Sequence, residues 1–304
     1  MKESYHICFT SHDEVMFRDQ EDHGMFLNLM ALRAYGNDTE ILAEAEMATH
    51  CHINAFTQWP IRFAGACRMS YTKYFNHKYD RKGRMGEKYT FILKIDGFCH
   101  QMVALSYILR NGLHHGAAPT ALGYRYCSVR EMFAQDIGLS NEKASSFSRA
   151  DIASFLPRYS EFPDQWQMNE QGVFIRQSFM ELRRAEQYYG SPRNYLYQMN
   201  RLTDDSWKQD QLRDNTGAPI TLNDLEHADD KSVAQMLNNE YGRNFRRDRM
   251  QDMDVCRLID RELVPPFGVR SVYLLNETQK KRIARQLYHE FNLPEHQIRR
   301  CLVL

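Results

Sequence analysis

Long apolar stretches are missing from this 304-residue sequence. No segment approaches the roughly 20 apolar residues that a membrane-spanning helix needs, and the opening residues 1–6 contain no apolar region of a secretory signal. Internal repeats and low-complexity tracts are missing too. We therefore expect a cytoplasmic protein without a membrane partner, and 26% charged with 43% hydrophobic residues is typical of a globular chain.

Paired cysteines are also missing. The seven cysteines are scattered along the chain, and no two of them are spaced as CxxC. An odd and dispersed set in a cytosol-like sequence indicates free thiols, so we expect neither a disulfide framework nor a cysteine zinc site.

A net charge of one sign is absent as well, because 39 basic residues balance 39 acidic ones. Their distribution is nevertheless uneven. Residues 61–94 carry nine basic residues against two acidic ones, and residues 270–304 carry seven against three. The first of these runs is interleaved with aromatic residues. One basic run alone is usually a solvated face, but two such runs suit a polyanion with stackable bases.

The hydrophobic pattern predicts an alternation of strands and helices over the first third of the chain. Strands are expected near residues 5–17, at 40–47, at 50–57 and at 88–95, and helices at 22–35, 60–79 and 97–111. We take Asp22 as the N-cap of the first helix and Asn111-Gly112 as the stop of the third. This order predicts an α+β sandwich in which helices cover a mostly antiparallel sheet.

The texture of the sequence changes after about residue 135. Residues 136–230 are polar and interrupted by prolines, which predicts short helices in an extension or linker. Residues 231–304 form a basic helical region, with one amphipathic helix at 277–291 and a second from Glu295 onward, in a helix-turn-helix-like arrangement. The predicted domains are thus 1–135, 136–230 and 231–304. Contact between DNA and the last region is as plausible as a plain helical hairpin.

Two histidines at alternate positions form the first candidate for chemistry. In His50-Cys51-His52, a strand directs both imidazoles to the same face, where they can share a metal ion. Two surface histidines are the commoner explanation of an isolated pair, so this pair needs further partners.

The helix at 97–111 supplies the candidate partners. Its residues Phe98, Met102, Leu105 and Leu109 are spaced to face a core, and Tyr107 lies about 200° round the helix from Leu105. Asn111 follows on the same face as Tyr107, four residues later. A phenol and an amide placed in this way could provide a nucleophile and an oxygen ligand. An ordinary half-exposed tyrosine above a capping asparagine is the alternative.

These motifs together resemble the single-tyrosine HUH transposases, and among them the REP-associated tyrosine transposase group. The resemblance covers about 130 residues. Its parts occur in family order: His50-Cys51-His52, Ser70-Tyr-Thr-Lys-Tyr-Phe-Asn76, Ser106-Tyr-Ile-Leu-Arg-Asn111, Gly112-Leu-His-His-Gly116 and Gly123-Tyr-Arg-Tyr-Cys-Ser128. The sequence departs from the family at Ala48-Thr49, at Cys51, at Arg84–Tyr89 and at Gly112, which leaves every reactive group in place but alters positions where substrate is contacted.

The resemblance implies an HUH, ferredoxin-like fold that cleaves and rejoins single-stranded DNA at hairpin sites through a 5′-phosphotyrosyl intermediate. It makes Tyr107 the nucleophile and His50, His52 and Asn111 the ligands of Mg²⁺ or Mn²⁺. Dimers are common in the family, so a homodimer is possible. From the first basic run we expect DNA backbone contacts by Lys73, Lys78, Arg81, Lys82 and Arg84.

Two other functions remain open at this point. One is a domesticated, non-catalytic DNA-binding protein that recognises sequence or structure. The other is a metal-dependent hydrolase of small phosphoesters, which the basic runs disfavour.

Overall fold

The structure is a computed structural model that describes residues 1–11, 14–86, 90–203, 205–214, 217–226, 236–237, 239–240 and 249–304. Parts of the predicted 136–230 and 231–304 regions therefore lie outside the described residues. No helix among those that are described is long and apolar enough to cross a membrane.

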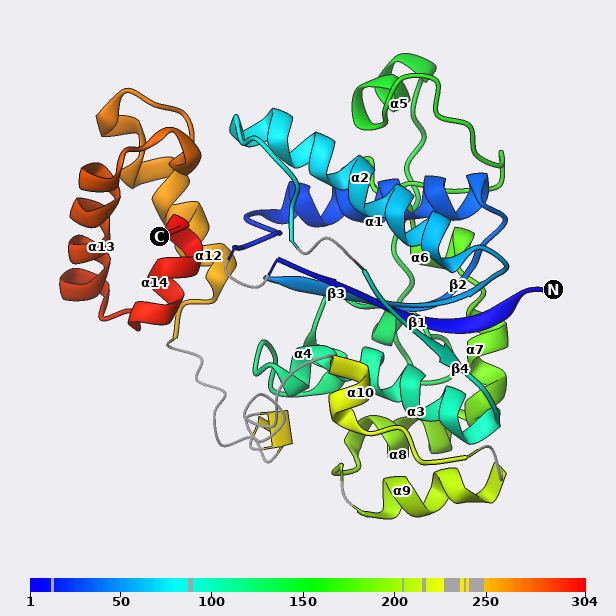
Figure 1. Ribbon diagram of the computed structural model, residues 1–304. Helices are drawn as coiled ribbons and strands as arrows, with labels where there is room; N and C mark the ends of the chain where they lie inside the picture. Colours follow the sequence, from blue (N-terminus) through cyan, green and yellow to red (C-terminus); the bar gives the residue numbers. More distant parts are fainter. Residues whose placement is uncertain are drawn as a thin grey trace.

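A four-stranded antiparallel sheet forms the centre of the molecule (Figure 1). Its strands are β1 (Glu3–Thr10), β2 (Glu40–Met47), β3 (His50–Thr57) and β4 (Phe91–Ile95), arranged in the order β2-β3-β1-β4. The α+β class is confirmed. The last predicted strand, at 88–95, is shorter than expected, and residues 87–89 lie outside the described part.

Helices cover both faces of this sheet (Figure 1). The helices α1 (Gln20–Gly36) and α2 (Pro60–Tyr79) lie over one face, and α3 (Phe98–Leu109) lies over the other. The N-cap of α1 is Asp19 rather than the predicted Asp22. Asp22 instead occupies the third helical position and completes a capping box with Asp19.

The third helix differs from its prediction in two ways. It ends at Leu109, and Asn111 begins a further short helix, α4 (Asn111–His114), instead of stopping the chain. The buried face of the helix is also different, because Tyr107 is fully buried whereas Phe98 is 52% exposed. The spacing of large apolar residues was misleading because α3 is covered on more than one side, by the sheet and by later helices.

The polar segment after residue 135 does contain short helices, as expected. They are α5 (Arg149–Phe155), α6 (Arg176–Phe179), α7 (Leu182–Tyr189), α8 (Pro192–Asn200), α9 (Asp205–Gln211) and α10 (Leu222–Glu226). Four of them, α7, α8, α9 and α10, contact α3, so the extension packs against the helix that carries Tyr107.

The C-terminal helices gather around a small core of their own. They are α12 (Asp252–Leu258), continued by a π-helical turn at Ile259–Leu263, then α13 (Glu277–Phe291) and α14 (Glu295–Leu302). Both helices predicted for this region are present. The predicted domain boundaries themselves stay a prediction.

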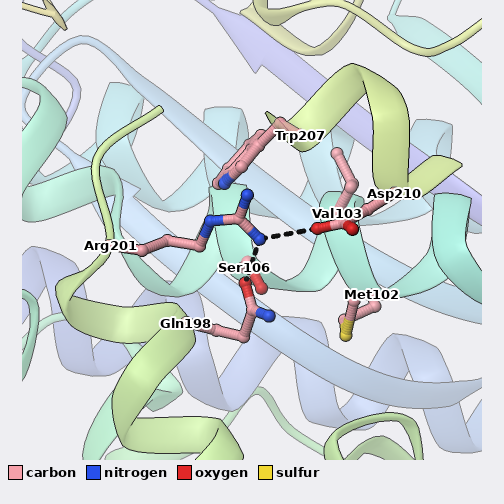
Figure 2. Close-up of a pocket in the computed structure, with 7 residues that line it drawn as sticks. All are labelled: Met102, Val103, Ser106, Gln198, Arg201, Trp207 and Asp210. Carbon is pink, nitrogen blue, oxygen red and sulfur yellow. Dashed lines mark hydrogen bonds and ion pairs between the residues drawn. The ribbon is translucent and has the colours of Figure 1, made fainter. Parts of the chain in front are cut away.

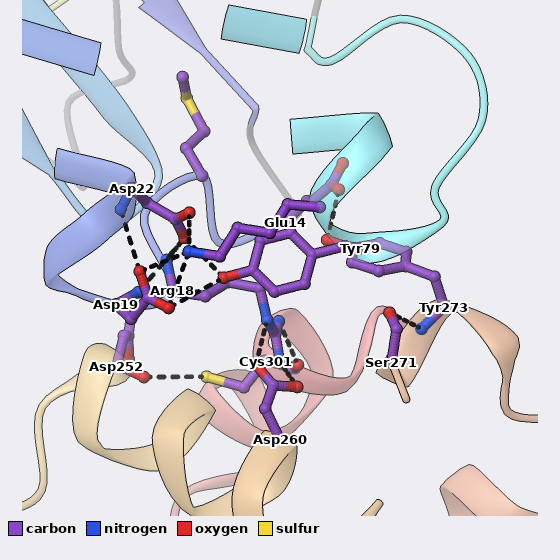
Figure 3. Close-up of polar contacts among 12 residues, drawn as sticks. Glu14, Arg18, Asp19, Asp22, Tyr79, Asp252, Asp260, Ser271, Tyr273 and Cys301 are labelled. Carbon is purple, nitrogen blue, oxygen red and sulfur yellow. Dashed lines mark hydrogen bonds and ion pairs between the residues drawn. The ribbon is translucent and has the colours of Figure 1, made fainter. Parts of the chain in front are cut away.

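A buried arginine joins the C-terminal helices to the sheet domain (Figure 3). The guanidinium of Arg18 donates from Nε and Nη2 to the two carboxylate oxygens of Asp260, at 2.8 and 2.9 Å, and from Nη1 to the carbonyl oxygen of Cys301 at 3.0 Å. Its side chain is completely buried, between the rings of Tyr79 and Tyr273. The bidentate geometry fixes how the two parts are oriented.

We expect Arg18→Met to lower the free energy of unfolding by about 3 kcal/mol or more, because it leaves the Asp260 carboxylate without its counter-charge. Urea denaturation measures this change. Arg261→Met, which removes an exposed arginine one residue from Asp260, should change stability by less than about 0.5 kcal/mol. Equal effects of the two substitutions would contradict the role given to Arg18.

Candidate metal and nucleophile site

The strand β3 directs His50 and His52 to the face of the sheet that α3 covers. Because β3 pairs with β1 on one side and β2 on the other, neither histidine is at a sheet edge. Both are buried, and their ring centroids are 5.0 Å apart. The side of β3 that carries Cys51 and Ile53 contributes instead to the hydrophobic core.

The phenol of Tyr107 lies beside these two imidazoles. Its ring centroid is 5.2 Å from that of His52, with the two planes nearly perpendicular, and 5.3 Å from that of His114. Its hydroxyl donates a hydrogen bond to the carboxylate of Glu226. The hydroxyl is therefore buried against a polar cluster, and not among apolar side chains.

Glu226 completes this cluster from a distant part of the sequence. It is the last residue of α10, and its carboxylate oxygens lie 3.4 Å from Nε2 of His52, 3.9 Å from Nε2 of His50 and 3.4 Å from Nε2 of His115. The sequence did not predict Glu226 as a site residue. It is one acidic residue in a polar extension, and no motif surrounds it. Glu226 lies 119 residues after Tyr107 in the sequence, and only the tertiary fold brings the two side chains together.

The ligand atoms of His50, His52 and Glu226 fit a divalent cation. One donor atom from each lies within 4.8 Å of the others, and the Nε2 atom of His52 is buried with no hydrogen-bond partner in the part of the chain that the structure describes. Two imidazoles and a carboxylate form a mixed set of nitrogen and oxygen ligands. Such a set suits Mn²⁺ better than Mg²⁺, because Mg²⁺ prefers oxygen ligands alone.

A row of buried polar groups lies behind His52. Nδ1 of His52 is 3.2 Å from Nε2 of His6, which in turn is 2.8 Å from the carbonyl oxygen of Leu225. Burial lowers the pKa of His52 to about 3, and the nearby His114 adds to this effect. His52 is therefore neutral at physiological pH, which is the form that binds metals. Burial raises the pKa of Glu226, whereas His50 opposes that rise.

The low pKa of His6 predicts a loss of stability in acid. Burial, with a contribution from His52, lowers this pKa from 6.5 to about 3. Between those values the unfolded chain binds the extra proton, so His6 contributes its full stabilisation above pH 6.5 and loses it as the pH falls toward 3. In chelator, we expect the loss of unfolding free energy between pH 7 and pH 5 to be about 2 kcal/mol smaller for His6→Gln than for wild type.

Urea titrations at the two pH values measure this difference, and His289→Gln is the matched control because His289 is exposed on α13. Wild type and His6→Gln with the same pH dependence would show that His6 is not held neutral in the folded protein.

Asn111, the predicted third ligand, is fully buried at the start of α4. Neither Oδ1 nor Nδ2 of its side chain has a hydrogen-bond partner among the described residues. Within the described ranges, the cluster of potential metal ligands consists of His50, His52 and Glu226. The role of Asn111 as a metal ligand stays a prediction.

The five basic residues predicted to contact DNA fall into two groups. Lys78 makes ion pairs with Asp19, Glu21 and Asp22, and Arg81 pairs with Glu14, so both contribute to contacts within the protein. The others are exposed at the end of α2 and in the loop that follows it: Lys73, Lys82 and Arg84. DNA contact by any of the five stays a prediction.

No family model matches this chain, and no curated protein matches its sequence. Among solved structures, the chain is similar to a REP-associated tyrosine transposase bound to a REP hairpin. The TM-score is 0.38 and the sequence identity is 13%, over 49% of this chain and 91% of that chain.

Proposed function

We propose that this protein is a metal-dependent enzyme that cleaves and rejoins single-stranded DNA at hairpin-type sites, with Tyr107 as the nucleophile. The observation that carries the proposal is a buried phenol that lies in one cluster with two imidazoles and a carboxylate. A tyrosine with only a packing role in the core would not require two imidazoles and a carboxylate around its hydroxyl. The basic runs of the sequence and the resemblance of its motifs to the HUH transposases point the same way.

The side chains present account for the proton and for the two bonds that change. The Tyr107 hydroxyl oxygen attacks phosphorus, and its proton passes to the Glu226 carboxylate that already accepts its hydrogen bond. The bond from phosphorus to the 3′-oxygen breaks, and this oxygen takes the proton from Glu226. The products are a 5′-phosphotyrosyl protein and a strand with a free 3′-hydroxyl. One phosphodiester replaces another, so the reverse attack by a 3′-hydroxyl rejoins DNA without ATP.

His50, His52 and Glu226 would hold a divalent cation, with Asn111 as a further candidate ligand. When bound, such an ion polarises the scissile phosphate and offsets the charge that develops on it. His6 lies behind His52, with its Nε2 3.2 Å from Nδ1 of that imidazole, and its ring limits how the His52 ring can turn.

Access to Tyr107 requires a movement. Its side chain is fully buried, and α10 covers it through Glu226. Leu225 and Glu226 are held to the site by the contacts to His6 and Tyr107. A phosphate reaches the hydroxyl only if α10 shifts locally when DNA binds, while the Glu226 carboxylate stays beside Tyr107 to accept its proton.

The direct test uses single-stranded and hairpin oligonucleotides, including those from DNA flanking the gene, incubated with the full chain and Mn²⁺. Attack by Tyr107 leaves the 3′ portion of the strand on the protein. Oligonucleotides labelled at the 3′ end should therefore label the protein in a denaturing gel, and those labelled at the 5′ end should release a shorter free strand. The proposal is wrong if strands are bound but the label never stays with the protein.

A non-catalytic DNA-binding protein is the second candidate, and one surface favours it. The helix α13 buries Ile283 and Leu287 against its own core, and on its other side exposes Lys281, Arg282 and Arg285. Such a helix could contact the phosphate backbone whether or not the strand is cut. Binding without any covalent product, on every hairpin tested, would favour this candidate.

A further inference from the structure

A cavity of about 500 Å³ lies beside the first turns of α3, where the extension packs on that helix. Its volume is within the range of about 300–1,000 Å³ that is typical of small-ligand pockets. Figure 2 shows the adjoining pocket, whose wall it shares at Met102, Gln198, Arg201 and Asp210. The remaining lining comes from the start of α3, from the end of α7 and the turn after it, from α8, and from Arg213 in the turn that follows α9.

Aromatic rings form the walls of this cavity and are left partly uncovered. Phe98 is 52% exposed and Tyr197 is 59% exposed. The ring of Tyr188 lies 5.2 Å from that of Phe98, at a tilt of 41°. Nucleobases stack on exposed aromatic rings of this kind. This stacking does not depend on the DNA sequence, because every base has a flat π-face.

The polar groups in the cavity suit the rest of a nucleotide. The carboxylate of Asp210 pairs with two guanidinium groups, those of Arg201 at 2.8 Å and Arg213 at 3.1 Å. The side chain of Arg213 is 76% exposed and can turn to a phosphate. The amide side chains of Gln187, Asn194 and Gln198 line the cavity and offer donors and acceptors to a base edge.

The position of the cavity relates it to the nucleophile. Phe98 and Tyr107 are at the two ends of α3, nine residues apart, which is about 13 Å at 1.5 Å per residue. At 100° per residue the two residues lie on opposite faces of the helix, and the middle of α3 is buried. A strand that contacts both the cavity and Tyr107 therefore has to pass outside α3.

We propose that this cavity binds a nucleobase of the single-stranded DNA on which Tyr107 acts, stacked on the exposed ring of Phe98 or Tyr197, with its phosphate on Arg213. The inference rests on the proposed function and adds to it a subsite built by the extension. The flat aromatic walls, the amides and the exposed guanidinium of Arg213 together favour a nucleotide over an apolar ligand.

Photochemical crosslinking tests this proposal on the full chain. The probe is oligothymidylate in which 5-iododeoxyuridine replaces thymidine, and crosslinked residues are mapped by mass spectrometry. We expect crosslinks at Phe98, Tyr188 or Tyr197. In parallel, Tyr197→Ala should weaken binding of oligothymidylate about 5- to 100-fold in anisotropy measurements, because each stacked base contributes a factor of this size. The control is Tyr159→Ala, since Tyr159 is 98% exposed and lies outside the cavity.

The outcomes separate the two proposals. Binding that is unchanged in Tyr197→Ala, with crosslinks confined to other residues, overturns the nucleobase subsite but leaves DNA cleavage by Tyr107 standing. No binding of any strand to wild type overturns both. Equal weakening by Tyr197→Ala and Tyr159→Ala also overturns the subsite, because it would reflect a general surface effect.

Discussion

Replacing Tyr107 with phenylalanine is expected to abolish the covalent protein–DNA product, by at least about a thousand-fold in initial rate, because loss of a nucleophile in an enzyme costs factors of up to about 10⁶. Phenylalanine keeps the ring that packs against His52 and His6, so the fold should persist. Binding of the strand should persist too, since the hydroxyl makes its one hydrogen bond to Glu226 and is not at the surface. The measurement is the retention of a 3′ label on the denatured protein.

The matched control for this substitution is Tyr71→Phe. Tyr71 is as deeply buried as Tyr107, and its hydroxyl also donates a hydrogen bond, at 2.6 Å to the carbonyl oxygen of Met16. Tyr71→Phe should keep the covalent product at near wild-type rate. If Tyr107→Phe retained the product as well, another residue would be the nucleophile and the assignment would be wrong.

The second large effect is expected at His52. We expect His52→Gln to weaken Mn²⁺ binding by more than about 100-fold and to remove the covalent product with it. Loss of an outer partner of a metal ligand costs about 10- to 100-fold in affinity, so loss of a ligand itself costs more. Chelation of the wild-type protein should have the same effect on the product, and added Mn²⁺ should restore it. Isothermal titration calorimetry measures the affinity.

His77→Gln is the control for that experiment, because His77 is exposed on α2. It should bind Mn²⁺ as wild type does. Tight binding of Mn²⁺ by His52→Gln would place the ion elsewhere in the protein and contradict the proposed ligand set.

Much of the fold was predictable because its signals are local. Helix 60–79 and the strands at 40–47 and 50–57 were predicted with their observed bounds, since alternation and helical spacing there coincide with Pro60 at the first helical turn. The buried face of α3 was not predictable, because Tyr107 and Phe98 exchange their expected environments when later helices cover α3. A single helix pattern carries no information about which distant segment packs on it.

The candidate site divides in the same way. The alternation of His50 and His52 on a strand and the neighbourhood of Tyr107 could be foreseen from the order of the motifs. Glu226 could not, since its place in the site depends on the path of about 90 residues of extension. The ion pairs of Lys78 with Asp19 and Asp22 could not be foreseen either, because a lysine in a basic run gives no sign of which carboxylates lie beside it.

Identification of the residue that carries the DNA tests the central claim most directly. The protein is incubated with Mn²⁺ and a cleavable hairpin strand, the attached DNA is trimmed with nuclease, and the modified peptide is sequenced by mass spectrometry. The account predicts a nucleotide 5′-phosphate on Tyr107. A nucleotide on any other residue, or cut strands that carry a free 5′-phosphate with no modified peptide at any time, would contradict it.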